Sequence, residues 1–305
     1  MNTRGKHYSP VKPARSYEEQ LTRLSEIHDL TIDDPARARY ILSTVNYYRL
    51  TTYGKHLRRA DDPEKFLDGV TLETLYGLYQ FDMNLRHLLL PVLEFFEVQL
   101  RAKIAYRLAI TYGSLGYMNA ENFRAETLPN GSSVHKNLIG KFKNEVKRQG
   151  ALPFVRHHKI KYGGQFPIWA AVELFTFGML GSLFDIMQEA DQRAVSRDYG
   201  LSPESLSRLI AAAVDVRNIC AHYNRLYNQP LEAQPLLPNR LRAYESDRLF
   251  PLLLALAHAL GRERVFTRLV TGVALLEEDY PEADLACCGF PENWRSVLEG
   301  EAAQT

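Results

Sequence analysis

The sequence has few cysteines and no motif that pairs them. Its three cysteines, Cys220, Cys287 and Cys288, lack C-x-x-C spacing, and the adjacent pair Cys287 and Cys288 is poorly placed to bridge to itself. We therefore expect reduced thiols in a cytoplasmic protein, without a zinc site. Residues 1–12 contain no apolar run, so no secretory signal is expected either.

Long hydrophobic runs without charge are also absent. The stretch of residues 166–187 is long enough to cross a membrane, but it contains Glu173 and Asp185, and charges are costly in lipid. The apolar stretch of residues 249–260 is too short to span. Both stretches predict buried helices of a core, and no membrane association is expected.

A strong excess of one charge is absent, although the charges are unevenly placed. Lys and Arg number 37 and Asp and Glu 36, which argues against a protein that is basic all over its surface. Residues 1–15 carry +4 and predict a disordered basic tail. Residues 136–161 carry +7, whereas residues 271–305 carry −7. The middle block is either a solvated helix face or a phosphate-binding surface. Its basic residues are Lys136, Lys141, Lys143, Lys147, Arg148, Arg156, Lys159 and Lys161.

Alternating strand patterns of convincing length are missing, and helical periodicity covers most of the chain. The expected fold is all-α, with one helical domain over residues 16–300 and a C-terminal helical extension from about residue 240. Helices are expected at residues 16–30, 34–47, 71–112 (kinked or split at Pro91), 133–149, 167–189, 247–260 and 262–278. Another helix is expected to begin at residue 202 and to end in the segment of residues 215–228.

Nucleotide-loop and metal-site motifs such as G-x-x-x-x-G-K-[ST], H-E-x-x-H or an EF-hand loop do not occur. One polar segment at the end of an apolar helix stands out, because it has the form R-x4-H with Arg217 and His222. Asn218 and His222 lie one helical turn apart and share a face. A second copy of the bare pattern, Arg23 and His28, lies in an ordinary amphipathic helix turn.

The residue types of this segment suit RNA cleavage without a metal. A neutral histidine can take the proton of a 2′-hydroxyl, and a protonated histidine can protonate the leaving 5′-oxygen. Arg217 offers a permanently charged fork for the phosphate oxygens, and Asn218 can orient His222 or contact phosphate. Because one histidine performs half of the acid–base work, a homodimer with two facing segments would supply both roles.

The segment also resembles the signature of a known family. Arg217-Asn218-x-x-Ala221-His222-x-x-Arg225-Leu-x-Asn228 is similar to the motif of the Abi family, the AbiD/AbiF group of abortive-infection proteins. Further matching elements lie at residues 46–50 (NYYRL, with Asn46 and Thr52 where glycines are usual), 78–86, 94–101, 167–178 and 289–294. The resemblance covers residues 40–295 in the family order.

This resemblance implies a HEPN-like helical bundle with additional N- and C-terminal helices. It implies that Arg217, Asn218 and His222 form the catalytic set of a metal-independent endoribonuclease, supported by Asp215, Arg225 and Asn228. It further implies a toxin of a phage-defence, toxin–antitoxin system, a homodimer and, for some members, a noncoding RNA antitoxin. No cofactor is expected.

Several alternatives remain open at this level. The chain could be a noncatalytic RNA-binding module that uses residues 136–161, or a purely structural helical scaffold. Arg49 and Arg86 match family positions and could contact RNA, but ion pairs with Asp82 or Glu97 are equally plausible. Trp169 and Phe177 could stack on bases or belong to the core, and Cys220 is expected to be a buried thiol.

Overall fold

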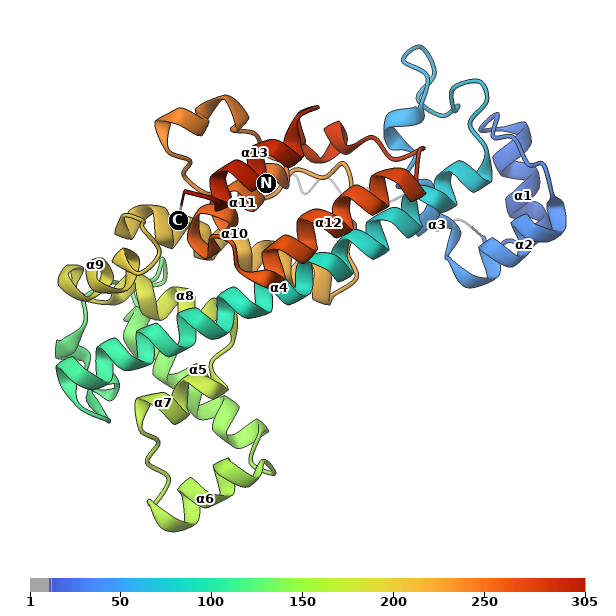
Figure 1. The fold of residues 1–305 in the computed structure, drawn as a ribbon. Coiled ribbons are helices and arrows are strands. Elements are labelled where there is room, and N and C mark those ends of the chain that lie inside the picture. The colour runs from blue at the N-terminus through green and yellow to red at the C-terminus, as the bar shows by residue number, and fades with distance from the viewer. Residues whose placement is uncertain (1–10, 12, 305) are drawn as a thin grey trace, which may run out of the picture. The chain divides into compact units, whose positions relative to one another are not determined.

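The computed structural model describes residue 11 and residues 13–304, which form helices joined by turns and loops (Figure 1). Within these residues, extended backbone pairs only as isolated bridges, such as that between Arg58 and Phe66. The expected all-α class is confirmed. The predicted basic tail of residues 1–15 lies outside the described part of the chain, apart from residues 11 and 13–15.

The chain divides into two compact units, and the boundary falls between Phe81 and Asp82. This boundary lies inside α4 (Leu72–Tyr112), a helix of 41 residues. The organisation expected from the sequence, one domain with an extension from about residue 240, stays a prediction.

The first unit is built on short helices whose starts follow from local capping chemistry. They are α1 (Tyr17–Glu26), α2 (Pro35–Thr44) and α3 (Tyr47–Thr51). Ser16 and Glu19 form a capping box at α1, in which each side chain accepts the other residue's backbone N–H. Asp34 caps α2 by accepting from the backbone N–H groups of Ala36 and Arg37. Apolar side chains from these helices, from the loops between them, such as Phe66, and from the start of α4 form the core of the unit.

Two helices of this unit are shorter than the periodicity indicates. α1 ends at Glu26 rather than near Leu30, and Ile27 beyond it is exposed. α2 ends at Thr44 because Val45 is extended. Asn46 then caps α3 by accepting from the backbone N–H of Tyr48 at 2.8 Å. Asn46, which stands where the resembled family usually has glycine, is therefore the N-cap of a new helix.

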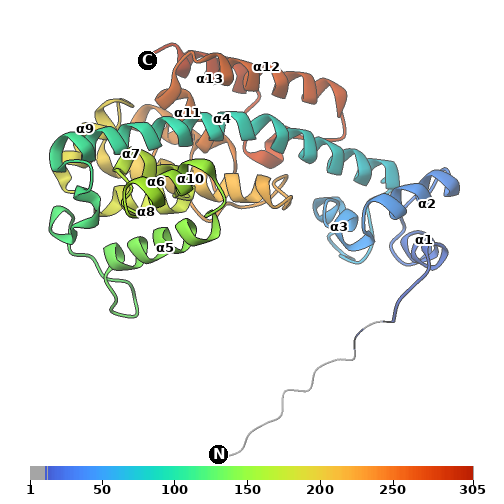
Figure 2. The ribbon, with the colours of Figure 1, turned by 90° about the horizontal axis from the view of Figure 1, so that it is seen from below.

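The second unit packs its helices along α4 (Figures 1 and 2). They are α5 (Val134–Arg148), α6 (Pro153–Lys161), α7 (Ile168–Ala171), α8 (Phe177–Ile186), α9 (Glu189–Arg197), α10 (Pro203–Ala221), α11 (Phe250–Leu260), α12 (Arg264–Asp279) and α13 (Trp294–Ala302). α11 is buried on nearly all sides, as its apolar sequence predicts, and it packs against α10 and α13. α12 runs beside α4, where Gly272 leaves room for Leu88.

Pro91 does not split α4, which continues through it. Proline removes one backbone N–H and so frees the carbonyl of His87 one turn earlier. Both Pro91 and His87 are exposed, so water can satisfy that carbonyl. The expected split at this position is therefore wrong, and the alternative, a kink, stays a prediction.

The predicted helix over residues 167–189 is wrong as well, because the chain breaks in its middle. α7 passes into a 3₁₀ turn (Val172–Leu174), and Phe175 is extended. Arg101 of α4 donates to the carbonyls of Val172 and Phe175, which replaces the helical hydrogen bonds lost there. Thr176 then caps α8 by accepting from the backbone N–H of Met179.

None of the helices in the described residues combines the length and apolar character needed to cross a membrane.

Candidate functional site

The candidate site lies at the C-terminal end of α10. Ser202 caps the start of this helix by accepting from the backbone N–H of Ser205, and Pro203 occupies its first turn. Leucine, isoleucine, alanine and valine side chains bury one face of the helix. At the other end, Asn218 and His222 are both exposed, and the backbone N–H of His222 donates to the Asn218 carbonyl at 3.0 Å. Both side chains are therefore accessible at this end of the helix, and the shared face expected from their spacing stays a prediction.

Arg217 is oriented by an acidic partner and an aromatic ring. Its Nη2 lies 3.5 Å from Oε2 of Glu97, and its guanidinium lies 5.7 Å from the ring centre of Phe177. The side chain is 27% exposed, and its Nε is buried without a hydrogen-bond partner. Arg217 is therefore held in place while part of its charge faces solvent.

The carboxylate of Glu97 forms ion pairs with two arginines. Its Oε1 accepts from Arg101 Nη2 at 2.7 Å, as the i,i+4 spacing on α4 predicts. The second contact, to Arg217, joins residues 120 positions apart, so no pattern of neighbouring residues predicts it. Arg101 in turn donates to the carbonyls of the break before α8. The same network thus orders the break and positions Arg217.

A strained turn follows His222. Tyr223 has φ +57°, a left-handed conformation that a bulky residue rarely adopts. The backbone N–H groups of Tyr223 and Asn224 donate to the carbonyls of Cys220 and Ile219, which is the Schellman arrangement usually closed by glycine. Strain of this kind costs about 1–3 kcal/mol and tends to collect at functional sites. Periodicity and spacing in the sequence carry no signal for this turn.

Asp82 fixes the chain beyond that turn. Its Oδ1 accepts from the backbone N–H groups of Leu226 and Tyr227 at 3.1 and 2.8 Å. Asp82 is fully buried and forms an ion pair with Arg86, which is 3% exposed. Two elements that the sequence suggested separately, residues 78–86 and 217–228, therefore meet at this carboxylate.

The residues predicted to support the site divide into different roles. Asp215 accepts from the backbone N–H of Glu232 at 3.1 Å, and Asn228 accepts from Arg248 Nη1 at 3.1 Å. Both side chains hold the loop of residues 228–240. Arg225 is half-buried close to the turn. Among the described residues, no hydrogen bond joins the side chains of Arg217, Asn218 and His222 to one another.

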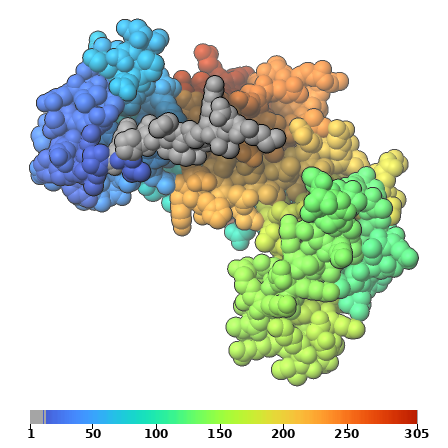
Figure 3. All heavy atoms as spheres, turned by 180° about the vertical axis from the view of Figure 1, so that it is seen from behind, coloured from blue at the N-terminus to red at the C-terminus, as the bar shows by residue number. Residues whose placement is uncertain are grey.

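The basic block of residues 136–161 lies on α5 and α6, which form a lobe of the second unit (Figure 3). All eight of its lysines and arginines are exposed, as expected for either reading of the block. Arg148 pairs with Glu145 at 2.6 Å. α8 packs against both α5 and α10, so the basic residues and His222 are carried by different layers of the unit.

Arg86 cannot contact RNA at the surface, because it is buried against Asp82. This prediction is corrected by the structure, and the ion-pair alternative holds. Arg49, in the first unit, is half-buried with its guanidinium 5.8 Å from the ring centre of Tyr79. Of the two aromatic residues left open, Phe177 belongs to the core and Trp169 is 57% exposed.

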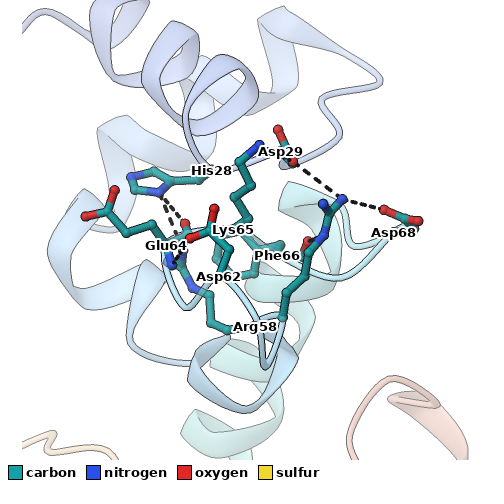
Figure 4. A network of polar contacts seen from close by, with 9 residues as sticks. His28, Asp29, Arg58, Asp62, Glu64, Lys65, Phe66 and Asp68 are labelled. Atoms are coloured by element: carbon teal, nitrogen blue, oxygen red, sulfur yellow. Dashed lines mark hydrogen bonds and ion pairs between the residues drawn. The ribbon is translucent and has the colours of Figure 1, made fainter.

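The second R-x4-H copy provides an internal comparison. His28 is buried in the first unit, and its Nδ1 lies 2.6 Å from the Glu64 carbonyl, where Arg58 also donates (Figure 4). Burial lowers the pKa of His28, which disfavours its charged form. His28 is therefore a structural histidine, in contrast to the exposed His222.

Possible metal ligands and the thiol of Cys220 were also part of the sequence predictions for the end of α10. No group of three or more histidine, cysteine or acidic side chains suited to a metal occurs within residues 13–304. Cys220 is buried, as predicted, and burial raises the pKa of its thiol to about 12. It is a packed side chain.

The fold and the site define an all-helical protein in which an exposed Arg-Asn-His segment ends a buried helix. A family model described as Abi-like protein matches residues 40–228, well over half of the chain, and the chain belongs to this family. Membership points to abortive-infection defence. A search of curated proteins and a search of solved structures gave no match. The narrower likeness to the AbiD/AbiF group and to HEPN proteins stays a prediction.

Proposed function

We propose that this chain is a metal-independent endoribonuclease toxin of a phage-defence system. The observation that carries the proposal is the end of α10, where exposed Asn218 and His222 accompany an arginine held by Glu97. The contrast with buried His28 supports it, since both histidines occur in the same bare pattern.

In the proposed reaction, neutral His222 takes the proton of a ribose 2′-hydroxyl. The 2′-oxygen attacks the adjacent phosphorus, the bond from phosphorus to the 5′-oxygen breaks, and a protonated histidine gives its proton to that leaving oxygen. The products are a 2′,3′-cyclic phosphate and a 5′-hydroxyl. Arg217 stabilises the charge that builds on the phosphate oxygens, and Asn218 orients the phosphate or the imidazole.

The reaction needs one neutral and one protonated histidine at the same time. We therefore propose that a second copy of the chain supplies the second histidine. An exposed apolar stripe supports this homodimer: Val98, Tyr106 and Ile110 lie at intervals of eight and four residues on α4 and are 55%, 71% and 68% exposed. Val98 directly follows Glu97, which holds Arg217. A stripe of exposed apolar side chains is a suitable place for a symmetric interface.

The proposal is tested by the chemistry of the product ends in the presence of EDTA. Cleavage of a labelled RNA should persist undiminished in EDTA, and the 5′ fragment should end in a cyclic phosphate that acid opens. Abolition of cleavage by EDTA, or fragments with 3′-hydroxyl ends, would assign the chain to metal-dependent nucleases instead.

Glu97→Gln should separate positioning of Arg217 from catalysis by His222. Loss of the carboxylate leaves Arg217 and Arg101 without their shared acid, so we expect cleavage to fall roughly 10- to 100-fold through misplacement of the guanidinium. Stability should fall by about 1–3 kcal/mol, because a hydrogen bond between charged, half-buried groups is lost. Cleavage rates and denaturant unfolding measure the two effects.

The matched control for this variant is Glu94→Gln. Glu94 lies on the same helix and is exposed. Equal losses in the two variants would show that Arg217 does not depend on Glu97.

A second candidate function is a noncatalytic RNA-binding module. The eight exposed basic side chains of α5 and α6 favour it, because phosphate contacts from lysine and arginine supply most nonspecific RNA affinity. This function predicts steep salt dependence and no role for His222. A noncoding RNA antitoxin, which rests on the family resemblance, and a cytoplasmic location, which rests on the sparse cysteines, complete the endoribonuclease proposal.

A further inference from the structure

Two adjoining pockets open on the lobe formed by α5 and α6. One has a volume of about 530 Å³ and the other of about 380 Å³. Leu115 and Gln165 line both, so the pockets are neighbours, and we call the two together the groove. Binding sites for small molecules have volumes of about 300–1,000 Å³. The groove is large enough for one nucleotide.

The floor of the larger pocket is aromatic and preformed. Tyr117, Phe142 and Phe166 line it, and all three are buried. The Phe142 ring centre lies 5.9 Å from that of Tyr117 and 5.8 Å from that of Phe166, both edge to face. The Tyr117 hydroxyl donates to the Phe166 carbonyl at 2.9 Å. These contacts hold the floor rigid without a ligand.

The rim of the larger pocket is positively charged. Lys143 and Lys147 lie one turn apart on α5, and Lys159 of α6 donates to the Val146 carbonyl at 3.3 Å. None of the described residues that line the two pockets is acidic. Glu145, the one acid of the basic block, is bound by Arg148. Three neighbouring ammonium groups without a carboxylate favour an anion between them.

The smaller pocket presents exposed aromatic faces. Trp169 and Tyr162 line it and are 57% and 46% exposed, together with His157 and His158. His158 stacks on Phe166 with ring centres 4.9 Å apart and planes at 14°, which joins this wall to the floor of the larger pocket. An exposed tryptophan beside a basic rim is the usual platform on which a nucleobase stacks.

We propose that this groove is a nucleotide-binding site, separate from the segment at the end of α10. The base stacks in the pocket of Trp169 and Tyr162, and the phosphate lies on the lysines of the rim. The ligand is a ribonucleotide, either free or as one unit of an RNA strand. The site does not depend on cleavage by His222.

The test measures how an oligoribonucleotide and AMP bind to the purified protein. Tryptophan fluorescence of the wild-type protein reports the groove, because the chain has two tryptophans and Trp294 is only 4% exposed. Titration with a short oligoribonucleotide, and separately with AMP, should quench the Trp169 emission. Quenching by AMP identifies a free nucleotide as sufficient, whereas quenching by the oligoribonucleotide alone identifies a unit of RNA. No quenching by either ligand would overturn the proposal.

Variants then locate the site by polarisation of a labelled oligoribonucleotide. Trp169→Ala should weaken binding roughly tenfold through loss of base stacking. Lys143→Ala/Lys147→Ala should weaken it by about tenfold or more, in proportion to lost phosphate contacts. Arg264→Ala/Arg268→Ala removes the same charge from one exposed face of α12 and should leave affinity unchanged.

Two further variants exclude competing explanations. Lys136→Ala/Lys141→Ala changes two lysines of α5 that lie outside the pocket linings. If this variant lost as much RNA affinity as Lys143→Ala/Lys147→Ala, RNA would bind to a diffuse basic surface rather than in the groove. An acidic peptide that competes as well as RNA would assign the groove to a protein partner. His222→Ala should bind with full affinity, so failure of this site and failure of the nuclease proposal remain distinguishable.

Discussion

His222→Ala is expected to abolish growth arrest in cells that express the chain. Removal of a general acid–base histidine lowers a reaction rate by about 10²–10⁴-fold. The side chain is exposed at the cap of α10, and its backbone hydrogen bond to Asn218 does not depend on the imidazole. Stability should therefore change by less than about 0.5 kcal/mol. Colony counts after induction and denaturant unfolding of the purified variant measure the two results.

The matched control is His87→Ala, which removes another exposed histidine from the same unit. It should leave growth arrest intact. Growth arrest that persists in His222→Ala at equal protein levels would remove His222 from the catalytic set.

Asp82→Asn is expected to cause the largest loss of stability. The carboxylate is fully buried, neutralises buried Arg86 and accepts the backbone N–H groups of Leu226 and Tyr227. Breaking one side of a buried ion pair typically costs about 3–5 kcal/mol, because the remaining charge stays in the interior. Denaturant unfolding of the purified variant gives this number directly. Growth arrest should also weaken, since the turn after His222 loses its anchor.

Asp198→Asn serves as the comparison, because Asp198 pairs with Lys103 at 2.9 Å on the surface. Surface pairs contribute about 0–1 kcal/mol, so this variant should unfold close to the wild type. If Asp82→Asn were no less stable than Asp198→Asn, the buried anchor would have no energetic role.

The sequence predicted those helix starts that local chemistry determines. Ser16 with Glu19, Asp34 with Pro35, and Ser202 with Pro203 are capping patterns that act within one turn, and all three begin helices as expected. The break at Phe175 was missed because its cause is Arg101, a residue more than 70 positions earlier. Apolar periodicity alone does not register a side chain that arrives from another helix.

The same limit applies to the site. Exposure of Asn218 and His222 follows from their spacing at the end of an apolar helix. The Glu97 contact to Arg217, the Asp82 anchor and the left-handed Tyr223 depend on tertiary contacts and backbone strain. The motif position of Arg86 left RNA contact and an ion pair equally plausible, and burial beside Asp82 decides for the ion pair.

The most direct test compares wild-type protein and His222→Ala in one experiment with a labelled RNA in EDTA. Binding is measured by polarisation, and cleavage is measured on the same samples. The proposed function predicts equal affinities, cleavage by the wild type to a 2′,3′-cyclic phosphate, and a rate for the variant lower by about 10²–10⁴-fold. Equal cleavage by both proteins, or binding without cleavage by either, would contradict it.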